Sequence, residues 1–155
     1  MKKITLLIIL ITTLILNGCG FHLRGPIKLD IRTFDIHGAD KVTEKKLVQK
    51  IASKNVSREK NSPELVIEFI TIKDDKRILS LTGRGQVAEY ELIKQVEYRI
   101  KTNEKWSEIK RIEIIRDYSY DPALYAAAAE EERLLKDTMQ EQMLNTILSE
   151  VSNIQ

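Results

Sequence analysis

Residues 86–101 have the sequence QVAEYELIKQVEYRIK, the most regular pattern in the chain. Apolar and polar side chains alternate along it, which is typical of an antiparallel β-strand with one buried and one solvated face. Lys94 interrupts the apolar face, and Ile93 is the exception on the polar face. The residues expected on the buried face are Tyr90, Leu92, Val96, Tyr98 and Ile100. This segment therefore predicts a long strand whose polar face is open to water.

The flanking sequence predicts three further strands and two helices. The charged residues 73–77 can carry the strand before the long one onward as a sheet edge. Glycines on both sides of Arg84 predict a hairpin turn that needs a positive φ. In chain order we expect a strand at Leu29–Ile36, a helix at Val42–Ser53, a loop at Asn55–Pro63, strands at Glu64–Lys73 and Trp106–Tyr118, and a helix from Asp121-Pro122 to about Ser152.

The last helix has a defined start and one apolar stripe. Asp121 suits the N-cap, and Pro122 suits the first helical position, where its missing N–H is not needed. Apolar side chains then recur every four residues, at Leu135, Met139, Met143, Ile147 and Val151. We interpret Met139 and Met143 as core residues rather than metal ligands, and Glu130-Glu131-Glu132 as a solvated face near the positive end of the helix.

The expected order of elements is β-α-β-β-β-α, and the sheet and both helices each have one apolar side. The economical packing lays both helices on one face of a four-stranded, mostly antiparallel sheet. The predicted fold class is therefore α+β, a two-layer sandwich. Residues 29–155 are expected to form this single domain, which fits the usual length of one folding unit.

The N-terminal segment predicts export from the cytoplasm. Lys2 and Lys3 precede an apolar stretch, residues 4–16, which fits the core of a signal peptide and is short for a membrane-spanning helix. The ending Leu16-Asn17-Gly18-Cys19 is similar to the lipobox of bacterial lipoproteins, in which the cysteine is acylated. We expect a signal peptide at 1–18 and a lipidated tether at 19–28. The other interpretation is a soluble secreted protein with one buried free cysteine.

The charge balance argues against a nucleic-acid partner. Removal of residues 1–18 would take away two lysines and leave 23 basic residues against 23 acidic ones. A nucleic-acid-binding face requires a clear basic excess. The hydrophobic fraction of 43% is ample for a folded core.

The sequence offers no catalytic set, no metal site and no cofactor site. The two histidines, His22 and His37, are isolated and lack metal-ligand spacing. The string Gly83-Arg84-Gly85-Gln86-Val87-Ala88 matches a dinucleotide-binding pattern, but a strand follows it where that pattern requires a helix. No serine lies in a nucleophile elbow. We therefore expect a protein that is not an enzyme.

Two surface features leave alternatives open. Four basic residues gather around one hairpin: Lys73, Lys76, Arg77 and Arg84. They indicate an anionic partner, since arginine binds phosphate with two parallel hydrogen bonds, or they are solvated charges that protect an edge strand. Residues 117–121 combine tyrosines and aspartates, either as a recognition surface or as a capped turn.

Three motifs give a family resemblance. They are Cys19-Gly20-Phe21-His22-Leu23-Arg24-Gly25, then Gly85-Gln86-Val87-Ala88-Glu89-Tyr90, then Arg116-Asp117-Tyr118 through Asp121-Pro122 into a helix rich in alanine and glutamate. In this order and with this element sequence, the chain resembles the lipopolysaccharide (LPS)-assembly lipoproteins, the LptE family. The resemblance covers nearly all of the chain after the signal peptide.

The resemblance implies a function. Such lipoproteins plug the outer-membrane β-barrel LptD at 1:1 stoichiometry, help it to fold and assist delivery of LPS to the outer leaflet. They are not enzymes and carry no cofactor. Gly20 in place of an aspartate favours the outer membrane, with the domain on the periplasmic side. The alternative is a free-standing outer-membrane lipoprotein that binds another envelope ligand.

The resemblance also implies site residues. Cys19 would carry the lipid, and Arg84, with Lys76 and Arg77, would neutralise LPS phosphate groups. A second basic position of the family, near the start of the last helix, corresponds to Ala128 here. This departure leaves a two-point phosphate clamp without its second member.

Overall fold

The structure, a computed structural model, describes residues 29–154. The expected signal peptide, the lipidation site Cys19 and the remainder of the tether lie outside the described residues. Within the described part of the chain, no helix combines the length and the apolar character needed to cross a membrane.

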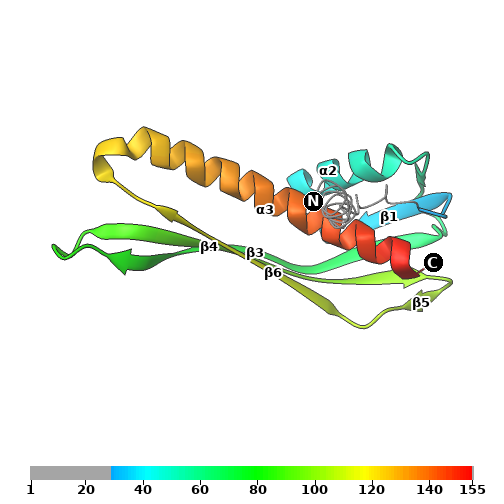
Figure 1. The fold of residues 1–155 in the computed structure, drawn as a ribbon. Helices are drawn as coiled ribbons and strands as arrows, with labels where there is room; N and C mark the ends of the chain where they lie inside the picture. The colour runs from blue at the N-terminus through cyan, green and yellow to red at the C-terminus, as the bar shows by residue number, and fades with distance from the viewer. Residues whose placement is uncertain (1–28, 155) are drawn as a thin grey trace, which may run out of the picture.

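A long antiparallel hairpin forms the centre of the sheet (Figure 1). Its strands are β3 (Leu65–Leu81) and β4 (Val87–Thr102), and the return strand β6 (Lys110–Ser119) pairs with the other side of β4. The predicted strand at 86–101 is thus confirmed, and its even-numbered residues from Leu92 to Ile100 are all buried. The opposite face is polar and carries cross-strand pairs, among them Arg99–Glu68 and Arg111–Glu97.

Three short strands complete the sheet. β1 (Thr33–His37) runs parallel to the start of β3, β2 (Ser57–Arg58) runs parallel to β1, and β5 (Lys105–Trp106) pairs antiparallel with the end of β4. The sheet has six strands, so the prediction of four is wrong, although the α+β class is confirmed.

A bulge explains one of the two additional strands, β5. The predicted strand at Trp106–Tyr118 is divided, because the returning chain has one more residue than β4 between the pairs Lys101–Trp106 and Tyr98–Lys110. Ser107 stabilises the irregular stretch: its N–H donates to the Ile100 carbonyl at 2.7 Å, and its Oγ accepts from the Ile100 N–H at 3.0 Å. The short β2 lies inside the segment predicted as a loop.

The second predicted strand continues beyond Lys73 as an edge of the sheet, which the sequence analysis allowed. It continues through the charged residues 73–77 to Leu81, while β1 pairs only with residues 65–68. Within the described residues no strand covers the β3 edge beyond this point, and the outer edge of β6 is open as well. On the β3 edge the Asp75 carboxylate accepts the Lys76 backbone N–H at 2.8 Å, and on β6 the Arg116 guanidinium donates to the Ile115 carbonyl at 2.7 Å.

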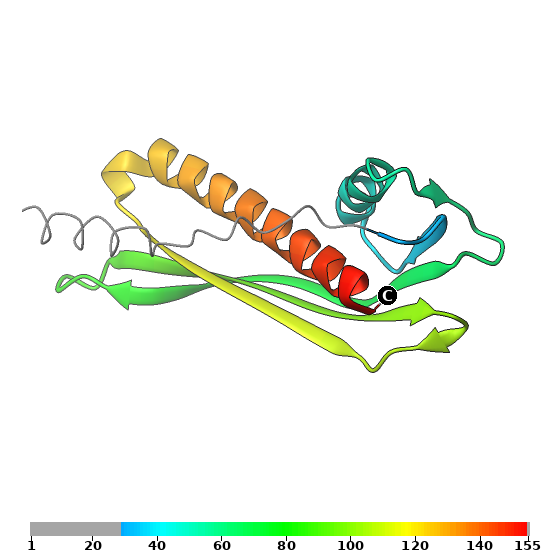
Figure 2. The same ribbon diagram turned by 45° about the vertical axis from the view of Figure 1, so that its right-hand side comes forward.

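Both helices lie on the same face of the sheet, as predicted (Figures 1 and 2). The helix α2 (Lys41–Ala52) is capped by Asp40, whose carboxylate accepts from the Val42 and Thr43 N–H groups. Asp121 caps a short 3₁₀ turn, η2 (Pro122–Leu124), and the long helix α3 (Tyr125–Ile154) follows. The two helices meet where Gln140 donates to the Thr43 hydroxyl at 3.0 Å.

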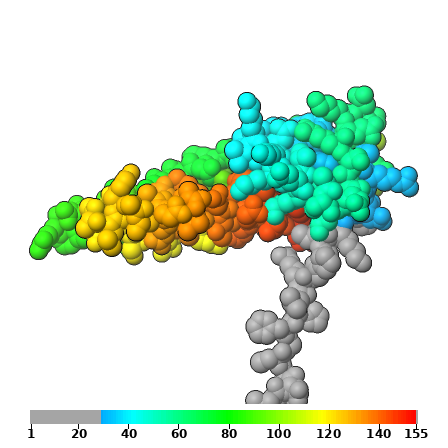
Figure 3. All heavy atoms as spheres, turned by 90° about the horizontal axis from the view of Figure 1, so that it is seen from above, coloured from blue at the N-terminus to red at the C-terminus, as the bar shows by residue number. Residues whose placement is uncertain are grey.

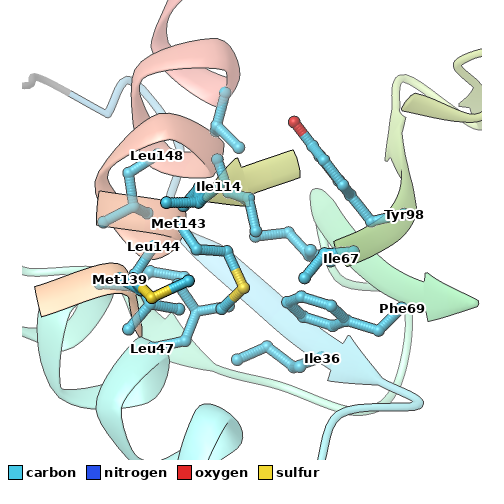
Figure 4. Packing of buried hydrophobic residues seen from close by; sticks show 14 of the residues in the cluster. Ile36, Leu47, Ile67, Phe69, Tyr98, Ile114, Met139, Met143, Leu144 and Leu148 are labelled. Atoms are coloured by element: carbon cyan, nitrogen blue, oxygen red, sulfur yellow. The ribbon is translucent and has the colours of Figure 1, made fainter. Parts of the chain in front are cut away.

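Most of the hydrophobic core lies in one half of the molecule, which we call the body, and a few buried residues, Leu92, Ile114, Tyr118 and Ala128, continue it toward the other end. In the body, α2 and the C-terminal half of α3 cover β1 and the neighbouring halves of β3 and β4 (Figure 4). The predicted stripe of α3 packs into it, with Met139, Met143, Ile147 and Val151 all buried. The hydrophobic residues with at most 1% exposure are Phe34, Leu47, Ile51, Leu65, Ile67, Leu92, Val96, Tyr98, Ile100, Met143, Leu144, Ile147 and Val151.

One glycine joins the elements of the body at close range. Gly38, between β1 and α2, has φ +71°, and a Cβ at this position would lie 2.1 Å from the Phe69 carbonyl oxygen. Phe69 itself precedes a register shift in β3. Only glycine fits this corner, because both the backbone conformation and the space exclude a side chain.

We call the other half the distal end. It comprises residues 73–94 of the β3–β4 hairpin, residues 114–119 of β6, η2 and residues 125–138 of α3. α3 runs along the length of the sheet, so its first turns lie above this hairpin (Figures 1 and 2). Viewed from above, the molecule is broad at the body and narrow at the distal end (Figure 3).

Candidate functional site

The hairpin turn between β3 and β4 exposes a cation. The Thr82 N–H donates to the Gln86 carbonyl at 2.7 Å, the Gly85 N–H donates to the Thr82 carbonyl at 2.9 Å, and Gly85 has φ +76°. The predicted turn is therefore confirmed. Arg84 lies at its tip and is exposed, and within residues 29–154 its guanidinium forms no ion pair. Its charge is available to a ligand.

The other two basic residues predicted for this site lie on opposite faces of the sheet. Side chains alternate along a strand, so the neighbours Lys76 and Arg77 point in opposite directions. Arg77 is on the polar face, where its Nε donates to Glu91 Oε2 at 2.5 Å. Lys76 is on the face covered by α3. The structure therefore does not gather Arg84, Lys76 and Arg77 into one cluster.

Lys76 takes part in a group of side chains that we call the Glu132 cluster. The Glu132 carboxylate of α3 accepts three hydrogen bonds of 2.6 Å: from Lys76 Nζ of β3, from Lys136 Nζ one turn along the helix, and from the Tyr118 hydroxyl of β6. Partial burial alone raises the pKa of Glu132, but these three donors outweigh it and lower the pKa to about 2. The carboxylate is therefore charged throughout the neutral range.

Tyrosine rings enclose the Lys76 ammonium. Lys76 Nζ lies 3.9 Å from the centre of the Tyr90 ring, and Tyr90 stacks on Tyr118 with ring centres 5.8 Å apart. Tyr120 approaches Tyr90 edge-on at 5.2 Å. A cation over an aromatic face adds roughly 0.5–2 kcal/mol to such a contact. The Glu132 cluster and the tyrosine rings around it thus connect β3, β4, β6 and α3 at the distal end.

Sequence reasoning missed the central residue of this cluster. Glu130, Glu131 and Glu132 were all expected on a solvated face, but the Glu132 side chain is only 19% exposed. Glu130 and Glu131 are exposed as predicted. Two signals in the sequence were available. One was the four-residue spacing of Glu132 and Lys136, and the other was the pair of tyrosines at 118 and 120, in a segment that the sequence analysis interpreted either as a capped turn or as a recognition surface.

Lys94, the interruption in the apolar pattern, is a buried ion-pair partner. Its side chain is 6% exposed, and Nζ lies 2.6 Å from Oδ1 of Asp74, the residue directly opposite on β3. The pair lies beside an open hollow of about 280 Å³ between the two helices and the sheet. An unpaired lysine at this depth would be costly, so Asp74 accounts for the tolerance of Lys94 in the core face.

Exposed aliphatic side chains surround the tip of the hairpin. Ile78, Leu79 and Leu81 of β3 are 54%, 45% and 57% exposed. Leu124 and Tyr125, at the start of the α3 region, are more than 60% exposed. Exposed apolar side chains close in sequence to an unpaired arginine are groups that an amphiphile with an anionic headgroup can contact. Across the described residues, no three His, Cys, Asp or Glu side chains converge in a way that could hold a metal ion.

The comparison with protein families gives a direct result. The family model described as lipopolysaccharide-assembly, LptE, matches residues 29–151, which include every strand and α2 and nearly all of α3. The chain belongs to the LptE family. The resemblance identified from the three sequence motifs is therefore confirmed. No curated protein matches the chain.

Solved lipoprotein structures share the fold of this LptE-family chain. An uncharacterized lipoprotein B from Nitrosomonas europaea has a TM-score of 0.75 and 28% identity, and the match covers 87% of this chain and 92% of that one. Rare lipoprotein B from Shewanella oneidensis has a TM-score of 0.71 and 29% identity, covering 79% and 96%. A minor lipoprotein from Acinetobacter baumannii, at 17% identity, has a TM-score of 0.63, covers 81% and 93%, and shares the fold.

Family membership and these neighbours support a role of this chain in LPS assembly and its description as a lipoprotein of the cell envelope. The LptE family is non-enzymatic, in agreement with the expectation from the sequence.

Proposed function

We propose that this chain is an outer-membrane lipoprotein subunit of the LPS export translocon, where it plugs and helps to assemble an LptD-like β-barrel at 1:1 stoichiometry. The observation that carries the proposal is the family match over residues 29–151. The lipid would be attached to Cys19, and residues 19–28 would tether the domain on the periplasmic side of the membrane. Multiple acyl chains on one cysteine give a stable anchor, since a single chain binds only marginally.

The shape and surface of the domain support a position inside a barrel. The molecule is elongated, with a narrow distal end (Figures 1 and 3), and no helix covers the second face of the sheet (Figure 1). Ion pairs such as Arg77–Glu91 and Arg111–Glu97 cover this face. A polar surface of this kind suits the polar interior of an outer-membrane barrel.

The hairpin tip is the proposed contact with LPS. Arg84 supplies an unpaired guanidinium for a phosphate group, and Ile78, Leu79 and Leu81 supply apolar surface for the start of the acyl chains. Lys76 and Arg77 are paired with Glu132 and Glu91, so each can bind the ligand only after it gives up its ion pair. Arg84 is therefore the first residue to test.

The test of the translocon assignment is extraction of the tagged protein from outer membranes with detergent, followed by mass spectrometry of what remains bound. We expect one large β-barrel protein in equal amount. In cells that lack the barrel, the Cys19→Ala variant should no longer be found in the membrane fraction, because neither a lipid anchor nor the barrel would hold it there. A lipoprotein isolated alone would contradict the proposal and favour the free-standing lipoprotein with another envelope ligand.

The test of the LPS contact is the binding of LPS to Arg84→Glu. We expect weaker binding with an unchanged circular dichroism spectrum, because the side chain lies at an exposed turn. Arg111→Glu on the polar face of the sheet is the matched control, since it makes the same charge change away from the tip. Equal binding by both variants would remove Arg84 from the site.

A further inference from the structure

The Glu132 cluster has the composition of an anion-binding site. Two ammonium groups and a phenol converge on one carboxylate, and each donor lies 2.6 Å from one of its oxygens. The donors come from three elements, β3, β6 and α3, so the fold fixes their relative positions. Charged hydrogen bonds of this length are the type that proteins use to hold carboxylate and phosphate ligands.

We propose that Glu132 occupies a phosphate-binding site of this protein as an internal competitor, and that a phosphate monoester displaces its side chain to bind Lys76, Lys136 and Tyr118. This inference rests on the proposed function, because it names a second place where a phosphorylated lipid contacts the domain. It concerns residues other than Arg84 at the hairpin tip.

The α3 side of the site is accessible. An open hollow of about 320 Å³ is lined by Glu132 and Lys136 together with Tyr125, Ala129 and Arg133, so displacement of the Glu132 side chain is what gives a ligand in this hollow access to Lys76 and Tyr118. The Lys136 side chain is 53% exposed, so an incoming anion reaches this ammonium first. Arg133 pairs with Glu130 and Asp137, both about half exposed, and these surface pairs break at small cost.

Charge and local concentration decide the competition. A phosphate monoester carries about 1.5 to 2 negative charges at neutral pH and three acceptor oxygens, while Glu132 offers one charge and two oxygens. The attached carboxylate, however, is always present at high effective concentration. Phosphate alone should therefore bind weakly to the wild-type protein. Phosphate groups concentrated on a lipid surface should bind better.

The experiment compares Glu132→Gln with Glu130→Gln in titrations with inorganic phosphate, followed by ³¹P NMR. Both variants remove one negative charge from the same stretch of α3, but Glu130 touches neither Lys76 nor Lys136. Removal of the competing carboxylate should raise the phosphate affinity of Glu132→Gln by about tenfold or more, and Glu130→Gln should stay within about twofold of the wild type. Adding Lys136→Gln to Glu132→Gln should cancel the gain.

Two further measurements complete the test. Glu132→Asp retains the negative charge but shortens the side chain, so we expect a smaller gain in phosphate affinity than for Glu132→Gln. Vesicles of phosphatidylcholine containing phosphatidic acid, a phosphate monoester lipid, separate a lipid headgroup from free phosphate as the source. A gain with either probe supports the proposal, and equal affinities of Glu132→Gln and Glu130→Gln for both probes would overturn it. The barrel co-isolation is independent of this outcome.

Discussion

The body and the distal end of this domain are stabilised by different interactions. In the body, apolar side chains such as Leu47, Leu144 and Ile147 are fully buried between the helices and the sheet. At the distal end, Ile78, Leu81 and other aliphatic side chains are about half exposed, and the Glu132 cluster connects α3 to the hairpin. Full burial of one large apolar side chain contributes roughly 1.5–3 kcal/mol, whereas a partly exposed ion pair contributes about 0–1 kcal/mol.

The two halves therefore differ in how easily their side chains can change partners. Hydrophobic burial gives the body one packed arrangement, since any displacement leaves voids. Ion pairs and hydrogen bonds at the distal end exchange partners at lower cost, so the proposed replacement of a protein group by a ligand requires no unfolding of the domain. The following substitutions test this contrast, in order of decreasing effect.

The largest loss of stability is expected for Leu144→Ala in the body. Leu144 is fully buried, and truncation of such a residue costs about 2–5 kcal/mol of unfolding free energy. Leu134→Ala is the matched control: this leucine lies in the distal half of the same helix and is 51% exposed, so we expect a change within about 0.5 kcal/mol. Urea unfolding measures both values, and similar losses would contradict the contrast.

Two glycines with nearly the same φ give the second test. Gly38 in the body has φ +71° and no room for a Cβ, whereas Gly85 at the distal turn has φ +76° and open space. Gly85→Ala should cost about 1–2 kcal/mol for its backbone conformation alone. Gly38→Ala should cost clearly more in the same thermal melts, because the Phe69 carbonyl must move as well. A smaller loss of stability for Gly38→Ala than for Gly85→Ala would show that the backbone around Phe69 can move to accommodate the added Cβ.

Glu132→Gln should have an intermediate effect that depends on pH. The pKa of Glu132 in the folded protein is about 2, below its usual value of 4.5, so its charge stabilises the fold above about pH 4.5. This contribution is lost as the pH falls toward 2. We expect wild type to exceed the variant by about 1–2 kcal/mol at pH 7, and the two to converge near pH 2. A difference that is constant with pH would exclude this role.

The smallest effect on stability is expected for Arg84→Glu. The side chain lies at an exposed turn and forms no ion pair among residues 29–154. The midpoint of urea unfolding should equal that of the wild type, although LPS binding falls. A lowered midpoint would mean that Arg84 stabilises the hairpin.

The sequence allowed most of the fold to be predicted, because the periodic patterns of its main strand and its long helix are strong. The alternation at 86–101 and the four-residue spacing from Leu135 to Val151 both placed their elements within a few residues of the structure. The charged segment 73–77 was ambiguous, since charge is compatible both with a loop and with an edge strand. The division of the last strand at Ser107 was missed, because a one-residue bulge leaves little trace in a pattern.

The candidate site was less predictable, because it depends on which face each side chain occupies. Lys76 and Arg77 are neighbours in sequence, and only the register of β3 against β4 places them on opposite sides of the sheet. Glu132 is 56 residues from Lys76 along the chain, and its role follows from the path of α3 above the hairpin. Contacts of this range depend on the packing of whole elements, which no local pattern encodes.

The open edges of β3 and β6 have a consequence for the behaviour of the isolated domain. An exposed strand edge is a template on which other chains can stack, which is the first step of fibril growth. Here Asp75 already binds a backbone N–H on one edge, and Arg116 already binds a backbone carbonyl on the other. An incoming strand would have to break these bonds and then accommodate the charged residues 73–77. The domain thus carries, within its own edges, a kinetic obstacle to self-association.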